Sequence, residues 1–269
     1  MKESVKILVA GAAGKMGRTI LELAAQDPDI KIAGAFERAD HPAIGRDVGE
    51  FIGQDRFCIP IHPDIRECIS LGDVLIDFTH PSTTLLHVKL ALSSHCQMVI
   101  GTTGLSDVLI REIKKASKRI GIVQSPNMSL GVNLLFRLAA LTASVLDPSY
   151  DVEIVEAHHR HKKDAPSGTA LELVRQIAQA RKISLDSNVV FGRKGEVGAR
   201  KKGIVGVHAV RGGDVVGDHT VSFLTEGERL ELIHRASSRG AFAKGALLAA
   251  KFIAKKRFGF YNMQQVLGL

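Results

Sequence analysis

The sequence lacks tryptophan, and aromatic residues make up only 5% of its 269 positions. Stacking platforms for nucleic-acid bases are therefore scarce, although the formal net charge is +8. An anionic small-molecule ligand explains that charge as well as a nucleic acid does. The densest basic run, Arg200-Lys201-Lys202, lies between two glycines and is interpreted as a solvated loop tip.

Cysteine is also scarce, and long hydrophobic runs are missing. Cys58, Cys68 and Cys96 are odd in number and form no C-x-x-C pair, which argues against a disulfide framework and a cysteine zinc site. We expect all three to be ordinary buried thiols. No apolar run reaches the roughly 18 residues of a membrane span. The start, Met1 to Lys6, leads into a strand-like run and not a cleavable signal, so we expect a soluble cytoplasmic protein.

The N-terminal half has the rhythm of a β-α-β fold. Short β-rich runs alternate with helical stretches, and the runs in Ile7–Ala10 and Val74–Ile76 are continuously apolar, as in parallel strands covered on both faces. The sequence therefore predicts an α/β domain with a doubly wound, Rossmann-type parallel sheet. The expected strands are Val5–Ala10, Lys31–Phe36, Val74–Thr79, Met98–Thr103 and Gly121–Ser125.

The pattern changes after a helix expected over Leu130–Leu146. Residues 151–156 alternate polar and apolar, which indicates a strand of a mixed or antiparallel sheet that is wet on one face. Further expected elements are a helix over Ala170–Ala180, a strand over Gly203–Val210, and a hairpin joining His219–Leu224 to Arg229–His234. These predict a second α+β domain with a mixed open sheet.

The last amphipathic helix, expected over Phe242–Ile253 before a short tail, cannot form a domain alone. We expect it to dock on the N-terminal sheet, which makes that domain discontinuous. The predicted boundaries are 1–127 with 240–269 for a dinucleotide-binding domain, and 128–239 for a substrate-binding and oligomerisation domain.

A glycine turn follows the first expected strand and opens a helix. Its spacing is G-x-x-G-x-x-G, formed by Gly11, Gly14 and Gly17, and it allows a tight turn, close approach of a pyrophosphate, and close packing of helix on strand. Glu37 lies at the end of the second strand, where an acid accepts hydrogen bonds from ribose hydroxyls. The neighbouring Arg38 suits the 2′-phosphate of NADP. These residues predict NADH or NADPH as cofactor.

Two further strand ends carry small polar loops, Asp77–Pro81 and Gly101–Gly104. Ligands of open α/β sheets bind at the carboxyl ends of the strands, where such loops can orient a nicotinamide and its ribose. A simple helix cap explains each loop equally well.

The stretch from Glu156 to Ala170 concentrates acidic, histidine and basic side chains, for which folding alone gives no reason. Such a cluster supplies a proton donor and anion-binding groups, and Ser167-Gly168-Thr169 then opens a helix whose amide groups form an anion site. A solvated basic loop is the alternative. A metal site is not expected, because adjacent histidines in a strand face opposite ways and no H-E-x-x-H spacing exists.

The run Glu156-Ala157-His158-His159, with Lys162 and then Asp164–Ala170, resembles the signature of the dihydrodipicolinate reductase family. The resemblance extends to Gly11–Arg18, Phe36–Arg38, Asp77–Thr79, Gly101–Gly104 and Pro126-Asn127, and so spans most of the chain. It implies a usually homotetrameric cytosolic enzyme of lysine and diaminopimelate biosynthesis. Such an enzyme reduces a cyclic dicarboxylate with NADH or NADPH and has neither nucleic-acid nor membrane partners.

The resemblance also implies residue roles. His158 is the expected proton donor, and Lys162, chosen over Lys163 by its spacing from His158, is the expected charge stabiliser. The expected substrate contacts are His159, Ser167, Gly168, Thr169 and Arg239. The expected cofactor contacts are Gly11, Gly14, Lys15, Met16, Gly17, Glu37, Arg38, Phe78, Thr79, Gly101, Thr103, Ser125, Asn127 and Met128. His80 stands where many relatives have arginine, which leaves the cofactor preference open. The alternatives are another two-domain Rossmann oxidoreductase and a non-enzymatic dinucleotide sensor.

Overall fold

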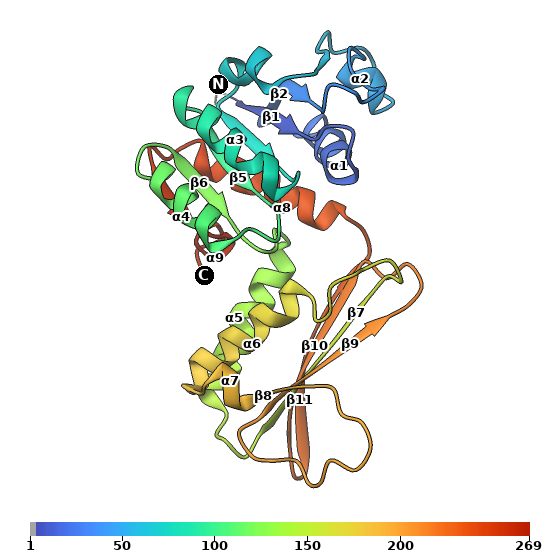
Figure 1. Cartoon of the computed structure of the whole chain (residues 1–269), viewed down its shortest axis with the longest axis vertical. Coiled ribbons are helices and arrows are strands. Elements are labelled where there is room, and N and C mark those ends of the chain that lie inside the picture. The colour runs from blue at the N-terminus through green and yellow to red at the C-terminus, as the bar shows by residue number, and fades with distance from the viewer. Residues whose placement is uncertain (1–3) are drawn as a thin grey trace. The chain divides into compact units, whose positions relative to one another are not determined.

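The structure is a computed structural model that describes residues 4–269, so the expectation for the start at Met1 lies partly outside the described residues. The chain forms two compact units, one of residues up to Leu130 together with Arg239–Gly268, the other of Gly131–Ser238 (Figure 1). The boundaries inferred from the sequence stay predictions. Within the described part, no helix is long and apolar enough to cross a membrane.

The N-terminal unit contains a seven-stranded sheet in which every pairing is parallel. The strand order β12-β6-β5-β4-β1-β2-β3 confirms the predicted Rossmann-type fold. The strands are β1 (Val5–Ala10), β2 (Ile30–Phe36), β3 (Ile61–His62), β4 (Val74–Asp77), β5 (Gln97–Ile100), β6 (Gly121–Gln124) and β12 (Gly259–Tyr261).

Helices cover both faces of this sheet (Figure 1). Ile7 and Val9 of β1 point into a core shared with α1 (Lys15–Ala24) and α8 (Gly240–Ile253), as expected for the last long helix. Leu8 and Ala10 point into the opposite core, shared with α3 (Pro81–Ser93) and α4 (Asp107–Ala116). Burial on both faces explains why the strand is continuously apolar. Shorter elements are α2 (Val48–Phe51), α9 (Met263–Leu267) and two 3-10 turns, Ile65–Glu67 and Ile69–Leu71.

Three expectations for this unit were wrong in detail. β4 ends at Asp77 and not at Thr79, because the Asp77 carboxylate accepts hydrogen bonds from the Thr79 backbone N–H and hydroxyl and bends the chain. β5 ends at Ile100 and not at Thr103; the Thr102 hydroxyl bonds back to Asp77. The expected tail after Ile253 instead forms the seventh strand, β12, and the capped helix α9.

The second unit has a five-stranded mixed sheet in the order β11-β10-β7-β9-β8, which confirms the predicted sheet type. β7, β8 and β9 run parallel, and the β10–β11 hairpin pairs antiparallel with β7. The elements are α5 (Leu130–Val145), β7 (Asp151–His158), α6 (Gly168–Arg181), α7 (Leu185–Asn188), β8 (Val189–Phe191), β9 (Val205–Arg211), β10 (Gly217–Thr225) and β11 (Glu228–Ala236).

Helices α5 and α6 lie side by side over one face of this sheet (Figure 1). Val152 and Ile154 of β7 point into that core with Val221 and Phe223 of β10. Because side chains alternate along a strand, Glu156 points to the same face two positions later. The end of β7 therefore places a carboxylate where the apolar core stops.

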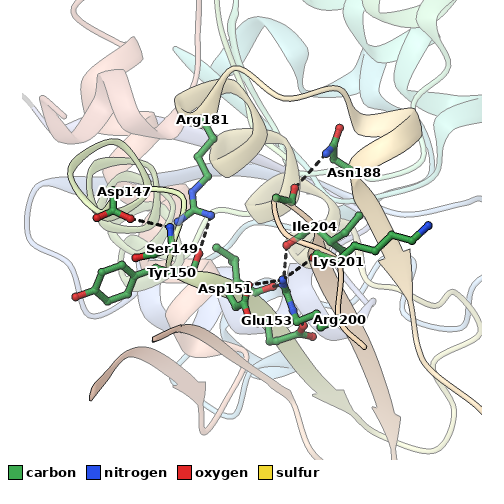
Figure 2. Close-up of polar contacts among 12 residues, drawn as sticks. Asp147, Ser149, Tyr150, Asp151, Glu153, Arg181, Asn188, Arg200, Lys201 and Ile204 are labelled. Atoms are coloured by element: carbon green, nitrogen blue, oxygen red, sulfur yellow. Dashed lines mark hydrogen bonds and ion pairs between the residues drawn. The ribbon is translucent and has the colours of Figure 1, made fainter. Parts of the chain in front are cut away.

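Two expectations about exposure were wrong. Arg200 is not a solvated loop tip, because its guanidinium donates to Asp151 at 2.6 Å, to Glu153 at 2.9 Å and to the Ile204 carbonyl at 2.6 Å. Figure 2 shows these residues around the guanidinium. Acidic side chains of β7 attract the arginine inward, whereas Lys201 and Lys202 are exposed as expected.

Of the three cysteines, Cys58 is exposed and not buried, in a turn where its φ is +58°. Cys68 and Cys96 are buried as expected, and burial raises the pKa of each thiol to about 12. These two thiols are therefore unreactive packing residues.

Candidate active site

The glycine turn is sterically required. Gly11 has a φ of +65°, and the Gly14 N–H donates to the Gly11 carbonyl at 2.9 Å. A Cβ atom on Gly17 would lie 2.1 Å from that same carbonyl oxygen, closer than any side chain tolerates. Helix α1 begins at Lys15 without a side-chain cap, so its first amide groups and positive end face the turn. The chain therefore presents a backbone cradle for a phosphate.

Glu37 extends from the end of β2 to this cradle. Its carboxylate accepts hydrogen bonds from the Ala13 N–H at 3.1 Å and from the Arg38 N–H at 3.0 Å. The Arg38 side chain is largely exposed and pairs with Asp40 at 3.2 Å. The acid and the base predicted to contact the adenosine ribose thus lie beside the turn, and the residues present fit a dinucleotide.

The loop after β4 is built around Asp77, which is completely buried. Burial alone raises the pKa of this carboxyl, but hydrogen bonds from His87 and Thr79 outweigh it and lower the pKa. The Phe78 ring packs on Gly101, where an added Cβ would lie 2.2 Å from the ring. The loops after β4 and β5 are therefore locked to each other at the carboxyl edge of the sheet.

A pocket of about 640 Å³ is lined by six of the residues predicted to contact the cofactor. Its lining includes Gly11, Gly14, Glu37, Arg38, Phe78 and Thr79, together with His41 and His80. The remaining predicted contacts do not line it: Lys15, Met16, Gly17, Gly101, Thr103, Ser125, Asn127 and Met128. They belong to the same unit and follow the carboxyl ends of β1, β5 and β6. Their contact with the cofactor stays a prediction.

In the second unit, strand register brings together side chains from three strands. Glu156 on β7 pairs in register with His219 on β10, and His158 on β7 pairs with Arg211 on β9. The Glu156 carboxylate is fully buried and lies 2.5 Å from His158 Nδ1. Arg211 grips the same carboxylate with two hydrogen bonds of 2.8 Å. The expected proton donor is thus held by a buried carboxylate that pairs with a partly exposed arginine.

These contacts shift the protonation of each group. Burial raises the pKa of Glu156, but hydrogen bonds from Arg211, His158 and the Ser167 N–H outweigh burial. The net effect lowers the pKa, so this carboxyl is ionised. Burial lowers the pKa of His158, and the attraction of Glu156 offsets only part of that effect. His219 packs edge-on against His158 at 5.3 Å between ring centroids. Burial lowers the pKa of His219 to about 3, so it is neutral.

The start of α6 lies next to this pair. Ser167 caps the helix by accepting the Ala170 N–H at 3.1 Å, and its own N–H donates to Glu156 at 3.0 Å. Its hydroxyl also lies 3.2 Å from His219 Nε2. Gly168 is exposed and Thr169 is 8% exposed, so the positive end of α6 is open to a ligand at Gly168. The helix end can hold a carboxylate close to His158.

Lys162 and His159 lie in the loop after β7. The Lys162 ammonium pairs with the Asp164 carboxylate at 2.8 Å and is one-fifth exposed. The His159 ring lies 6.2 Å from that of His161, and its Nδ1 has no hydrogen-bond partner among the described residues. Arg239 precedes α8 in the N-terminal unit, so its contact with substrate stays a prediction.

Sequence reasoning missed three members of this site. Glu156 was part of the signature but had no assigned role, and Arg211 and His219 carried no signal at all. Both come from strands far along the chain, and only the register of the mixed sheet places them beside His158. Among residues 4–269, no group of three or more histidine, cysteine or acidic side chains is arranged to hold a metal ion.

The fold and the glycine turn together define a two-domain, dinucleotide-binding oxidoreductase. Residues 5–128 match the family model described as dihydrodipicolinate reductase, N-terminus, and residues 131–267 match the one described as dihydrodipicolinate reductase, C-terminus. The chain therefore belongs to the dihydrodipicolinate reductase family, whose members are nicotinamide-dinucleotide-dependent reductases.

Individual relatives agree with this assignment. Proteins named 4-hydroxy-tetrahydrodipicolinate reductase from Syntrophus aciditrophicus and Nitrosomonas eutropha are 46% and 49% identical to the chain, each match covering 98% of both proteins. A solved structure of a dipicolinate-bound dihydrodipicolinate reductase from Paenisporosarcina sp. TG-14 has a TM-score of 0.76. It is 26% identical and covers 97% of this chain and 98% of its own.

Proposed function

We propose that this chain reduces 4-hydroxy-tetrahydrodipicolinate to tetrahydrodipicolinate with a hydride from NADPH or NADH and one proton, while the 4-hydroxyl group leaves as water; this is a step of lysine and diaminopimelate biosynthesis. The observation that carries the proposal is the histidine at the end of β7, which is largely buried, bonds to an ionised carboxylate and lies beside the N-terminal end of α6. A proton donor beside a carboxylate site is what reduction of a cyclic dicarboxylate requires. The two named relatives support this substrate.

The chain's own residues have separate tasks in this reaction. The cofactor, when bound through the glycine turn and Glu37, supplies the hydride. The start of α6, with Ser167, Gly168 and Thr169, holds a substrate carboxylate. Lys162 exchanges its Asp164 partner for substrate and stabilises the developing negative charge. His158 then delivers a proton from Nε2, because Nδ1 is occupied by Glu156.

We also propose that both nicotinamide cofactors are accepted. Glu37 offers an acceptor for ribose hydroxyls, while the exposed Arg38 guanidinium is free to leave Asp40 for a 2′-phosphate. Titration of NADPH and NADH against the wild type and Arg38→Ala tests this assignment. We expect NADPH affinity to fall about tenfold and NADH affinity to change little, since one exposed ion pair is lost. Equal losses for both cofactors would contradict it.

The proposed assembly is a homotetramer without nucleic-acid or membrane partners. Apolar side chains on the face of the second sheet opposite α5 and α6 support self-association, because Val155, Val210 and Ile233 are 40%, 51% and 52% exposed there. The expected compartment, the cytoplasm, is a prediction of the sequence.

A direct assay tests the proposed activity. NADPH oxidation is followed with enzymatically generated 4-hydroxy-tetrahydrodipicolinate and, in parallel, with a panel of keto acids and linear imines. We expect turnover with the cyclic dicarboxylate alone. Faster turnover of a panel member would assign another two-domain dehydrogenase activity, and cofactor binding without any turnover would indicate a dinucleotide sensor.

A further inference from the structure

We propose that Glu156 and Arg211 form a positioning pair that fixes the His158 imidazole and the start of α6 as one preorganised unit. Neither residue needs to touch substrate for this role. The part of the inference that concerns turnover rests on the proposed function, whereas the part that concerns the imidazole does not.

The Glu156 carboxylate makes four hydrogen bonds with three residues, Ser167, Arg211 and His158. Oε1 accepts from the Ser167 N–H at 3.0 Å and from Arg211 Nη2 at 2.8 Å. Oε2 accepts from Arg211 Nη1 at 2.8 Å and faces His158 Nδ1 at 2.5 Å. Because an ionised carboxylate only accepts, His158 must carry a proton on Nδ1. The neutral imidazole is thereby held in the tautomer whose Nε2 is open to take up and deliver a proton.

Space at Nε2 is preserved by a glycine. A Cβ atom added to Gly217 on β10 would lie 3.1 Å from His158 Nε2, tighter than ordinary van der Waals contact. Gly217 is buried, and no positive φ demands a glycine at this position. Glycine at position 217 therefore leaves space around His158 Nε2, the ring nitrogen that does not bond to Glu156.

Arg211 extends the same unit to the substrate loop. Besides gripping Glu156, its Nη2 donates to the Asp164 carbonyl at 2.7 Å, two residues beyond Lys162. One guanidinium thus joins β9, the end of β7 and the loop that carries the expected charge stabiliser. Since the Glu156 carboxylate also accepts from the Ser167 N–H, this one ion pair sets the relative positions of the proton donor and the start of α6.

The charges around His158 determine what the pair does to its titration. Lys162 and Arg211 repel a proton on His158, the neutral His219 lies edge-on to the ring, and Glu156 is the carboxylate that attracts the proton. Removal of the carboxylate leaves two cations facing the ring. We therefore expect the protonated, donating form of His158 to be confined to lower pH in a variant without that charge.

The first test is Glu156→Gln, studied by the pH dependence of kcat with saturating NADPH and substrate. Activity requires protonated His158 and so falls as pH rises through its pKa. We expect this fall to move at least about one pH unit lower, with kcat reduced about tenfold near neutrality and NADPH affinity unchanged. Glu153→Gln is the matched control: it lies on the same strand and holds Arg193, Arg200 and His208, not His158, so its profile should equal the wild type.

A lower kcat in Glu156→Gln without a shift of the pH profile would overturn the proposal. Loss of folded protein lowers kcat at every pH and does not change the pKa of His158. If that variant does not fold, Arg211→Lys serves in its place. Lysine retains the charge but lacks the bidentate grip, and we expect a smaller shift in the same direction. An unshifted profile in that variant would equally contradict the role.

Nitrogen NMR of the His158 ring in the wild type gives a readout that needs no turnover. We expect neutral His158 to be protonated at Nδ1 and bare at Nε2. Protonation at Nε2 instead would overturn the positioning role whatever the enzyme does. If the wild type fails to turn over the dicarboxylate but shows the Nδ1 tautomer, the proposed function fails and the positioning pair stands.

Discussion

Glu156 and Lys162 are both charged residues of the candidate site, but they differ in burial. This difference indicates which of them holds the site together and which can contact a ligand. Glu156 is fully buried yet ionised, because Arg211, His158 and a backbone N–H compensate it. Burial of an uncompensated carboxylate would cost several kcal/mol, so such a network persists only when its partners are all in place. Lys162, in contrast, keeps a partly exposed ion pair that a ligand can exchange.

Lys162 and its neighbour Lys163 offer a matched pair of substitutions. Lys162→Met removes the ammonium expected to stabilise charge in the transition state, so we expect kcat to fall by about a hundredfold. NADPH affinity should not change, because the dinucleotide pocket lies in the other unit. Lys163 is exposed, and Lys163→Met should retain wild-type activity. Steady-state kinetics checks both; the reverse pattern would move the role to Lys163.

The packing of α1 on the glycine turn is the next feature at the level of elements. A methyl group on Gly17 would meet the Gly11 carbonyl at 2.1 Å and the Ala12 Cα at 2.9 Å, both backbone atoms that cannot turn aside. Gly17→Ala must therefore displace the helix from the turn. We expect about 1–3 kcal/mol of lost stability and at least about tenfold weaker NADPH binding.

Calorimetric titration and urea unfolding measure these two effects. Gly212→Ala is the control, since nothing lies within 4 Å of an added Cβ there and its φ is not positive. Unchanged cofactor binding in Gly17→Ala would show that the turn does not receive the dinucleotide.

Element order and type were predictable because they depend on local pattern. The continuously apolar β1 and the spacing of Gly11, Gly14 and Gly17 require no knowledge of distant residues. Strand register does depend on distant residues, and so the roles of Arg211 and His219 could not be predicted. The same limit applies to β12, which is three residues long and becomes a strand only by pairing with β6.

Glu153 forms a second, partly buried cluster of charged side chains with Arg193, Arg200 and His208, and this cluster holds the loop before β9. Burial raises the pKa of this carboxyl, but hydrogen bonds from Arg193, His208 and Arg200 outweigh it and lower the pKa to about 2. A carboxyl with a lowered pKa stabilises the fold above its unfolded pKa near 4.5, and that contribution is lost as the pH falls toward 2. Wild type should therefore exceed Glu153→Gln in stability at pH 7, by a margin that shrinks below about pH 4.5.

Urea unfolding from pH 7 to pH 3 tests this sign. Glu226→Gln, exposed in the turn between β10 and β11, serves as a control and should follow the wild type throughout. A margin that grows on acidification would contradict the assignment of Glu153 as an ionised tether for residues 193–200.

The whole molecule is expected to assemble through the open face of its mixed sheet. Sedimentation equilibrium should give four times the chain mass of 29.0 kDa. Val155 lies in the middle strand of that face, so Val155→Asp places a charge where the proposed subunits meet and should yield smaller species. Lys118→Asp, on the surface of the dinucleotide-binding unit, should leave the mass unchanged. A monomeric wild type would contradict the tetramer.

The assignment of His158 as proton donor is tested most directly by one comparison at whole-enzyme level. NADPH oxidation by wild type and His158→Gln is measured with saturating 4-hydroxy-tetrahydrodipicolinate, and NADPH affinity is titrated for both proteins. We expect turnover to fall by about 10²- to 10⁴-fold, as for loss of a general acid, with cofactor affinity within about twofold. Undiminished turnover, or weakened NADPH binding with intact chemistry, would contradict the account.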